Sequence, residues 1–301
     1  MEKVLVAGAT GFLGRHVVKA LKKEGYHVSV LVRNKDKLKR RGNYMEPAID
    51  KEVDRVITAE ITKPITLEGV CEGIDYVFSS VGITRQRDGL TFHEVDYEGN
   101  TNLLREAENS NVKKFMYIHV LRGDVFEGPM TEAKEKFAKE LIRSKLVHLV
   151  IRPTGYFSDM TEFLNLAIKG RAFLIGKGIN KLNPIHGEDL AKFCVESFKL
   201  YSSEVLDVGG PEILTHQQIA KMAFKVIGEK EKITYLPTVL FPPMLKVYKM
   251  INKQQYGIFL FFYQGMTQNM IAPKYGSLSL EDFFVQYLNK KIATHSPSKS
   301  I

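Results

Sequence analysis

Hydrophobic residues in the first half of the chain occur in short continuous runs that are separated by amphipathic segments. The runs KVLVAG at 3–8 and HVSVLVR at 27–33 have the unbroken apolar character of strands that are buried on both faces. The segment after the first run places Val17, Val18 and Leu21 at helical spacing. This alternation predicts βαβ units, in which helices cover both faces of a parallel sheet.

The same pattern predicts how the chain is divided. Strands are predicted at residues 3–8, 27–33, 54–61, 74–82, 113–121 and 148–157. We therefore predict an α/β fold in which residues 1–155 form a doubly wound parallel sheet of the Rossmann type. Residues 156–291 are less regular and are broken by prolines, which predicts a smaller C-terminal substrate lobe, interleaved with the last strands and without a sheet of its own. The small polar residues of 292–301 predict a disordered tail.

Length and composition limit the classes of protein. The chain has 301 residues, of which 44% are hydrophobic, and this is enough to bury a full core. No apolar run approaches the roughly 20 residues of a membrane-spanning helix, and the chain begins with a strand instead of a signal peptide, which predicts a cytoplasmic protein. Cys71 and Cys194 lie far apart and are interpreted as small buried residues, so no metal site is predicted.

The formal net charge of +9 permits an acidic partner. The densest cationic run lies at 33–42, but it has no reading helix and no interleaved aromatic residues, so we predict no nucleic-acid partner. A second segment, 238–266, combines apolar and aromatic residues with Lys246, Lys249 and Lys253. It predicts either weak contact with a membrane surface or packing within the lobe.

The first predicted strand leads directly into the sequence GATGFLG, which contains Gly8, Gly11 and Gly14. Between a buried strand and an amphipathic helix, the first glycine permits a tight turn and the second lets backbone N–H groups approach a pyrophosphate. The third lets the helix pack closely on the sheet. The helix N-terminus adds the positive end of its dipole. Together these features predict a dinucleotide site.

The end of the second strand indicates which dinucleotide is bound. An NAD-specific site usually has a carboxylate there for the ribose hydroxyls, whereas this chain has Arg33, followed by Lys35 and Lys37. Such cations suit a 2′-phosphate, and Arg15 could add to them. We predict NADP(H) as the cofactor; the alternative is that these cations only face solvent.

These motifs give the chain a family resemblance. The stretches SSVG, VDYEGN, IRPTGYF, NPIHGEDLA, VGGPE and YGSLSLEDFF follow the glycine turn and Arg33 in the order and spacing of the atypical extended short-chain dehydrogenase/reductases. The chain resembles this family over nearly its whole length. Within it, the chain is most similar to the branch that contains divinyl chlorophyllide 8-vinyl reductase, and more distantly to the NADPH-carrying accessory subunit of respiratory complex I. The resemblance implies a Rossmann domain, a substrate lobe and a bound nicotinamide dinucleotide.

The resemblance also implies which positions hold the cofactor. They belong to the glycine turn, to the ends of the second, third and fourth strands, and to the turn after the sixth, and Lys37 joins them because of its charge. The residues are Gly8, Thr10, Gly11, Phe12, Leu13, Gly14, Arg33, Lys37, Glu60, Ile61, Ser80, Val81, Gly82, Pro153, Thr154, Gly155 and Tyr156. Glu60 and Ile61 stand where the family usually has an Asp near the adenine.

The usual catalytic residues of the family are only partly present. The family mechanism uses a Tyr as acid, a Lys four residues later that binds the ribose and lowers the pKa of the Tyr, and a Ser that orients a carbonyl. Here Met130 occupies the Tyr position, Lys134 is retained, and His119 lies near the Ser position. We expect Lys134 to be a ribose ligand; the alternative is a surface charge that supports its helix through pairs four residues apart.

Two residues are candidates for the missing proton donor. His119 is expected at the mouth of the fifth strand, and Tyr156 in the loop beside the nicotinamide. Their alternative roles are a hydrogen-bonded structural histidine and packing against the lobe. Two functions stay open: an NADPH-dependent reductase of an apolar, conjugated substrate, and a non-catalytic NADP(H)-binding redox sensor or assembly subunit.

Overall fold

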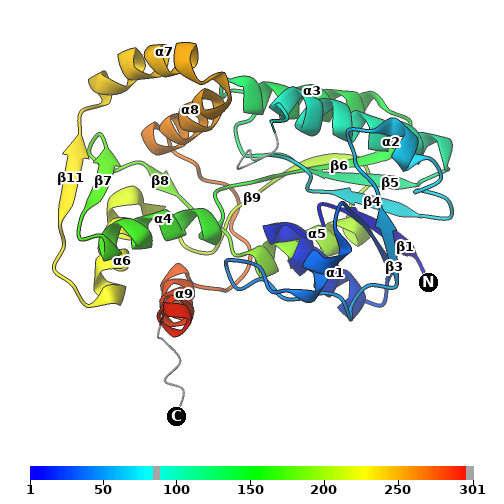
Figure 1. Ribbon diagram of the computed structural model, residues 1–301, viewed down its shortest axis with the longest axis horizontal. Coiled ribbons are helices and arrows are strands. Elements are labelled where there is room, and N and C mark those ends of the chain that lie inside the picture. Colours follow the sequence, from blue (N-terminus) through cyan, green and yellow to red (C-terminus); the bar gives the residue numbers. More distant parts are fainter. Residues whose placement is uncertain (84–88, 296–301) are drawn as a thin grey trace.

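The computed structural model describes residues 1–83 and 89–295, and its centre is a seven-stranded parallel sheet (Figure 1). The strand order is β3-β2-β1-β4-β5-β6-β9, and all neighbouring strands are parallel. The bounds are β1 (Lys3–Ala7), β2 (His27–Val32), β3 (Arg55–Thr58), β4 (Tyr76–Ser79), β5 (Lys114–Ile118), β6 (Val147–Pro153) and β9 (Glu204–Val208). The predicted doubly wound α/β fold is confirmed.

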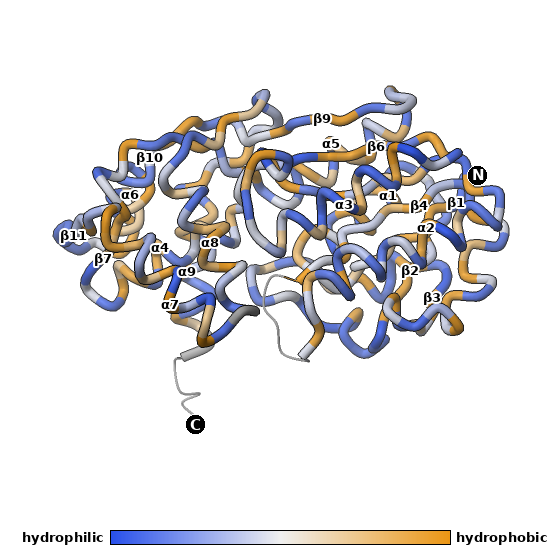
Figure 2. Tube along the Cα trace, turned by 90° about the horizontal axis from the view of Figure 1, so that it is seen from above, coloured by the Kyte–Doolittle hydropathy of each residue, from blue (hydrophilic) through white to orange (hydrophobic). Residues whose placement is uncertain are grey.

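Helices cover both faces of this sheet, which explains why its central strands β1, β4 and β5 are buried at almost every position. Helices α1 (Phe12–Lys23) and α5 (Gly187–Leu200) lie on one face, and α2 (Asn100–Asn109) and α3 (Pro129–Arg143) lie on the other. Along β1, Val4 and Val6 pack in the apolar layer under α1 and α5, whereas Leu5 and Ala7 pack in the layer under α2 and α3. Figure 2 shows this apolar character along the central strands.

The second lobe has its own hydrophobic core and is built from two parts of the chain. Its elements are α4 (Phe157–Ile168), β7 (Ala172–Ile175), β8 (Lys181–Leu182), β10 (Leu214–Thr215), α6 (His216–Ile227), β11 (Ile233–Leu236), α7 (Phe241–Ile251), α8 (Lys253–Thr267) and α9 (Leu280–His295). Between β8 and β10 the chain returns to the central sheet to form α5 and β9. Short helical turns complete the fold: η1 (Lys35–Lys39), η2 (Pro64–Leu67), the π-helix η3 (His93–Gly99) and η4 (Thr238–Leu240).

Two expectations about this part of the chain need correction. The lobe does form sheets, an antiparallel pair of β8 with β10 and a parallel pair of β7 with β11. These strands have two to four residues, too few for a period to be visible in the sequence. Helix α9 continues through His295, so residues 292–295 are helical; the rest of the predicted tail lies outside the described residues.

A buried arginine ties the glycine turn to the loop that follows β2. Arg15 is 4% exposed, and its guanidinium donates hydrogen bonds to the carbonyl oxygens of Thr10, Lys37, Arg40 and Pro47 at 2.6–3.2 Å. Burial lowers its pKa. The expectation that Arg15 adds to a 2′-phosphate site is wrong, because four of the five N–H groups of a guanidinium are used here by the backbone.

The last helix holds the same loop from the other side. The ammonium of Lys290, on α9, donates to the carbonyl oxygens of Gly42 and Asn43 at 3.0 and 2.9 Å. The Tyr44 ring stacks on Tyr287 of the same helix, with 5.9 Å between ring centroids. The 40–47 loop is therefore fixed jointly by the sheet domain and by the lobe.

We expect Arg15→Ala to lower the free energy of unfolding by roughly 2–4 kcal/mol, because four partly buried carbonyl oxygens lose a charged donor at once. Urea unfolding measures this change. Arg15→Lys should recover only part of the loss, since an ammonium cannot reproduce the geometry of the planar guanidinium. Arg55→Ala is the matched control, because Arg55 is exposed. Equal stability of the Arg15 and Arg55 variants would contradict this role.

Candidate functional site

The turn after β1 brings helix α1 very close to the strand. Gly8 has a φ of +84°, and its carbonyl oxygen accepts a hydrogen bond from the Gly11 N–H at 2.9 Å. A Cβ atom placed on Gly14 would lie 2.1 Å from that same oxygen. Only glycine fits at this position, so the roles predicted for Gly8 and Gly14 follow from the packing.

This turn lies at the point where the strand order reverses. Strand β1 pairs with β2 on one side and with β4 on the other. The Ser80 N–H donates to the Ala7 carbonyl at 3.1 Å, and a Cβ on Gly8 would lie 2.7 Å from the Ser80 hydroxyl oxygen. The turns after β1 and β4 therefore face each other at the carboxyl edge of the sheet, where doubly wound folds bind dinucleotides.

A buried asparagine shapes the turn after β4. The Asn100 side chain accepts a hydrogen bond from the Ser79 hydroxyl at 2.6 Å and donates to the carbonyl oxygens of Val81 and Asp96 at 3.3 and 3.0 Å. These bonds fix the backbone at Val81 and so position the neighbouring predicted cofactor residues Ser80 and Gly82.

The ammonium of Lys134 lies inside the protein, against the turn that follows β4. Its Nζ is 2.8 Å from Oδ1 of Asp96, whose side chain is fully buried, and only 13% of the Lys134 side chain is exposed. A Cβ on Gly82 would lie within 2.7 Å of both groups. Burial lowers the pKa of Lys134, but the attraction of Asp96 and Tyr117 outweighs it, so the pKa is raised. Lys134 therefore stays charged, and its partner belongs to η3 and not to its own helix.

A second buried side chain and a backbone group complete this cluster. The other carboxylate oxygen of Asp96 accepts the Ile83 N–H at 3.0 Å. The Tyr117 ring centroid is 5.6 Å from Nζ of Lys134, and its buried hydroxyl has no hydrogen-bond partner among the described residues. Burial raises the pKa of Tyr117 to about 12. The cluster thus holds a fixed, buried ion pair next to the predicted site.

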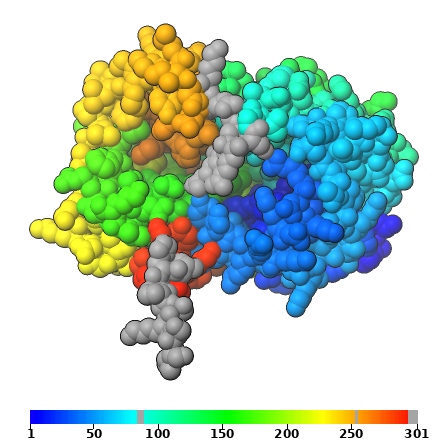
Figure 3. All heavy atoms as spheres, viewed as in Figure 1, coloured from blue at the N-terminus to red at the C-terminus, as the bar shows by residue number. Residues whose placement is uncertain are grey.

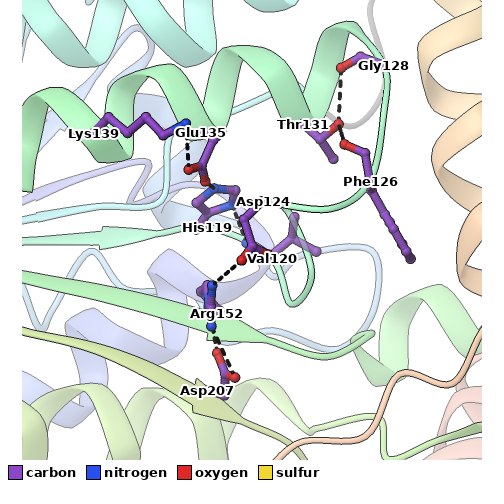
Figure 4. A network of polar contacts seen from close by, with 10 residues as sticks. All are labelled: His119, Val120, Asp124, Phe126, Gly128, Thr131, Glu135, Lys139, Arg152 and Asp207. Carbon is purple, nitrogen blue, oxygen red and sulfur yellow. Dashed lines mark hydrogen bonds and ion pairs between the residues drawn. The ribbon is translucent and has the colours of Figure 1, made fainter.

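His119 lies in a separate network in which both ring nitrogens are already bonded (Figure 4). Nδ1 accepts the Val120 N–H at 2.7 Å, and Nε2 lies 3.1 Å from Oε2 of Glu135. Its side chain is 1% exposed, and burial lowers its pKa. Arg152 continues the network by pairing with Asp124 and Asp207. This geometry favours the structural role of His119 over that of a proton donor.

Tyr156 lies where β6 leads into the lobe and packs against the glycine turn. Its half-buried ring is 5.5 Å from the ring of Phe12, and its N–H donates to Asp159 at 3.2 Å. Burial, followed by the charge of Asp159, raises the pKa of Tyr156, so its hydroxyl is a weaker acid than that of a free tyrosine. Backbone hydrogen bonds hold the two preceding residues. The Thr154 N–H donates to the Val208 carbonyl, and the Gly155 carbonyl accepts the Ile185 N–H.

The ends of β2 and β3 place the predicted 2′-phosphate residues at the surface. The guanidinium of Arg33 is 59% exposed and lies 3.7 Å from a carboxylate oxygen of Glu60. Lys37 is exposed on η1, and its carbonyl is fixed by Arg15. Ile61 is buried against Gly99. Arg33 and Lys37 thus project from a rigid loop.

Met130 lies in an apolar cluster that helix α8 covers. It is 7% exposed and packs with Ile83, Phe92 and, from α8, Ile258 and Phe261. The position of the usual acid is therefore surrounded by hydrocarbon. Figure 3 shows a hollow between the N-terminal part of the chain, in blue, and α8, in orange.

Sequence reasoning missed three residues of the site: Asp96, Asn100 and Tyr117. Asp96 and Asn100 are four residues apart in the stretch VDYEGN, a spacing that places them on one face of a helical segment. This spacing was an available signal for the first two. Tyr117 had none, because it lies within an unbroken apolar strand.

Comparison with known proteins identifies the family. Residues 8–199, more than half of the chain, match the family model described as NAD(P)H-binding. The chain belongs to this NAD(P)H-binding family. The protein therefore binds NAD(P)H, and the glycine turn with its close approach to α1 fits that ligand.

Curated relatives include both an enzyme and an assembly factor. The chain is 26% identical to chloroplastic divinyl chlorophyllide a 8-vinyl-reductase of Arabidopsis thaliana, over 96% of this chain and 78% of the relative. It is 28% identical to the photosystem II assembly factor Ycf39 of Synechocystis, over 78% of this chain and 71% of the relative. The resemblance to the vinyl reductase is confirmed.

Solved structures share the fold over almost the whole chain. Triphenylmethane reductase of Citrobacter in complex with NADP(H) has a TM-score of 0.73 at 16% identity, covering 94% of this chain and 99% of that chain. The NADPH-dependent quinone oxidoreductase QOR2 of Escherichia coli, complexed with NADPH, has a TM-score of 0.69 at 18% identity, covering 96% and 94%. At these identities the likeness concerns the fold alone.

We expect Lys134→Met to lower the free energy of unfolding by roughly 3–5 kcal/mol, because it leaves the Asp96 carboxylate buried without its counter-charge. Adding Asp96→Asn should recover much of this loss, since the buried charge is then removed. Urea unfolding of the two single variants and the double variant forms a double-mutant cycle. A double variant that is no more stable than Lys134→Met would contradict the pairing.

Proposed function

We propose that the protein is an NADPH-dependent oxidoreductase of the atypical short-chain dehydrogenase/reductase type, acting on an apolar, conjugated substrate. The observation that carries the proposal is the charged Lys134 beneath the Gly82 turn, next to the hydrocarbon cluster around Met130. The glycine turn, Arg33 and Lys134 would hold the cofactor, and NADPH supplies hydride when bound. The curated vinyl reductase relative supports this class of reaction.

The chemistry of the site favours an apolar substrate over a sugar or an alcohol. Met130 replaces the acid that alcohol and ketone chemistry uses, and its neighbours Ile83, Phe92 and Phe261 offer no polar group. A polar substrate would leave its hydroxyl groups unpaired there, at a cost in binding free energy. A flat apolar molecule would lose no hydrogen bonds on entering.

Tyr156 is the proton donor that the geometry favours. A tyrosine hydroxyl carries its proton at neutral pH, and Tyr156 lies at the junction of the glycine turn and the lobe. Lys134 acts on it as a nearby positive charge and favours its ionised form, as a donor requires once the proton leaves. His119 is less suited, because Glu135 and the Val120 N–H occupy both of its nitrogens.

The alternative function is a non-catalytic NADP(H)-binding redox sensor or assembly subunit. It is supported by the absence of the usual Tyr and Ser from this chain and by the curated relatives described as assembly factors. For either function we infer a cytoplasmic location and no nucleic-acid partner. The cationic run at 33–42 supports the inference that there is no nucleic-acid partner. Arg15 hydrogen-bonds to the carbonyl oxygens of Lys37 and Arg40 and so holds this run beside the glycine turn.

We expect the protein to bind NADPH at least tenfold more tightly than NADH, a ratio that corresponds to ~1.4 kcal/mol. The physical reason is the pairing of a 2′-phosphate with Arg33 and Lys37. Arg33→Asp should abolish or reverse this preference, whereas Lys51→Asp, at an exposed position outside the site, should leave it unchanged. Fluorescence titration with both cofactors measures the ratio. Equal affinities in the parent protein would exclude the assignment.

A second test concerns turnover. We expect NADPH oxidation with a conjugated apolar acceptor, such as a quinone, a triphenylmethane dye or a vinyl tetrapyrrole. Tyr156→Phe should lower kcat by roughly 10²–10⁴-fold without weakening NADPH binding, because only the proton is lost. The exposed Tyr201→Phe is the control, and His119→Gln should lower stability more than kcat. Tight NADPH binding without turnover of any acceptor would favour the non-catalytic alternative.

A further inference from the structure

The hairpin formed by α7 and α8 carries an exposed apolar surface at the edge of the lobe (Figure 1). Met250 and Ile251, at the end of α7, are 85% and 76% exposed. Other apolar residues of this surface, with exposures of 48–73%, are Val239, Leu240, Met244, Val247, Phe259 and Phe262. So much exposed hydrocarbon in one place is unusual for a face that only meets water.

The segment that contains this hairpin has cations and no anions. Between Glu231 and Glu281 the chain has no Asp or Glu, but it has five lysines: Lys232, Lys246, Lys249, Lys253 and Lys274. This stretch, less than a fifth of the chain, accounts for more than half of the net charge of +9. Lys246 and Lys249 are exposed on α7 beside the apolar residues. The surface is therefore complementary to one that is both apolar and negatively charged.

The opposite face of the hairpin is firmly attached to the sheet domain. The Gln264 side chain exchanges two hydrogen bonds with the backbone of Glu127, at 2.8 and 3.0 Å. A Cβ on Gly257 would lie 3.0 Å from Pro129, so α8 packs closely on the start of α3. The hairpin is thus a rigid element, and its exposed face is not needed to hold it in place.

We propose that the α7–α8 hairpin docks on an anionic lipid bilayer and lies in the interface between headgroups and acyl chains. Lys246 and Lys249 contact anionic headgroups, and Met250, Ile251 and Val247 enter the acyl boundary, as in interfacial amphipathic helices. No helix among residues 1–83 and 89–295 has the length and apolar character to cross a bilayer, so the hairpin lies along the surface.

Docking would place the site next to the membrane. Ile258 and Phe261, on the inner face of α8, line the cluster around Met130, while Phe259 and Phe262 face outward. The hairpin alone therefore separates the bilayer from the site. If the proposed reductase function holds, on which this step rests, the substrate is a molecule dissolved in the membrane.

The chain contains no tryptophan, so a single introduced Trp reports on one position. With vesicles of phosphatidylglycerol, Met250→Trp should show a blue shift of its emission, whereas Ile65→Trp, 72% exposed on the sheet domain, should not. Phosphatidylcholine vesicles should give a much smaller shift. Absence of the shift at position 250, an equal shift at position 65 or an equal response to both lipids would each overturn the proposal. A concentration-dependent shift without lipid would identify a second copy as the occupant and would also overturn it.

Charge reversal tests the role of the lysines. Lys246→Glu/Lys249→Glu should reduce flotation with phosphatidylglycerol vesicles at least tenfold, while Lys51→Glu/Lys63→Glu, at exposed positions on the sheet domain, should not. Equal flotation of the two double variants would contradict the proposal. NADPH binding, measured on all variants, should be unchanged, which separates a failure of membrane docking from a failure of the proposed function.

A third arm tests the membrane-dissolved substrate. NADPH oxidation should be faster with an apolar quinone held in phosphatidylglycerol vesicles than with the same quinone in detergent. The Lys246→Glu/Lys249→Glu variant should oxidise NADPH no faster with the quinone in vesicles than with the quinone in detergent. Its rate in detergent should equal that of the parent protein. An unchanged advantage in this variant would overturn the link between docking and substrate, whereas no oxidation in either medium would overturn the reductase function alone.

Discussion

The site depends on one buried ion pair. Lys134 remains charged inside the protein because Asp96 lies 2.8 Å away, and Asp96 in turn holds the turn after β4 through the Ile83 N–H. A charge buried without such a partner would be neutralised or would disrupt the fold. The pair therefore keeps Lys134 charged next to the turn after β4. It also requires glycine at position 82, because a Cβ atom there would collide with both charged groups.

The other end of the site is fixed by contacts that join distant parts of the chain. Arg15 holds the 37–47 loop from the side of α1, and Lys290 and Tyr287 hold it from α9. The 37–47 loop is consequently held by both lobes, although its residues are consecutive in the sequence. The lobe is thus connected through α9 to the loop that follows Arg33, one of the predicted cofactor residues.

Features set by local sequence were predictable, and those set by long-range packing were not. The strands follow from the period of the hydrophobic residues, and the glycine turn follows from backbone geometry. The importance of Lys134 was indicated by the family resemblance. The role of Arg15 was predicted wrongly, because proximity to the glycines in sequence does not show that the 37–47 loop folds back over it. Asp96 and Lys134 are 38 residues apart, with β5 between them, so only the fold brings them together.

The replacement of the usual Tyr by Met130 bears on the kind of reaction that the site favours. When hydride adds to a ketone, a full negative charge develops on one oxygen, and a strong donor must lie within hydrogen-bond distance of it. When hydride adds to the end of a conjugated system, the charge spreads over many atoms, and the proton can come from a more distant and weaker donor. An apolar residue at position 130 removes the first option, while Lys134 keeps its positive charge. The loss of the acid therefore supports the proposed reduction of a conjugated bond over that of a carbonyl, while the retained lysine is compatible with either reaction.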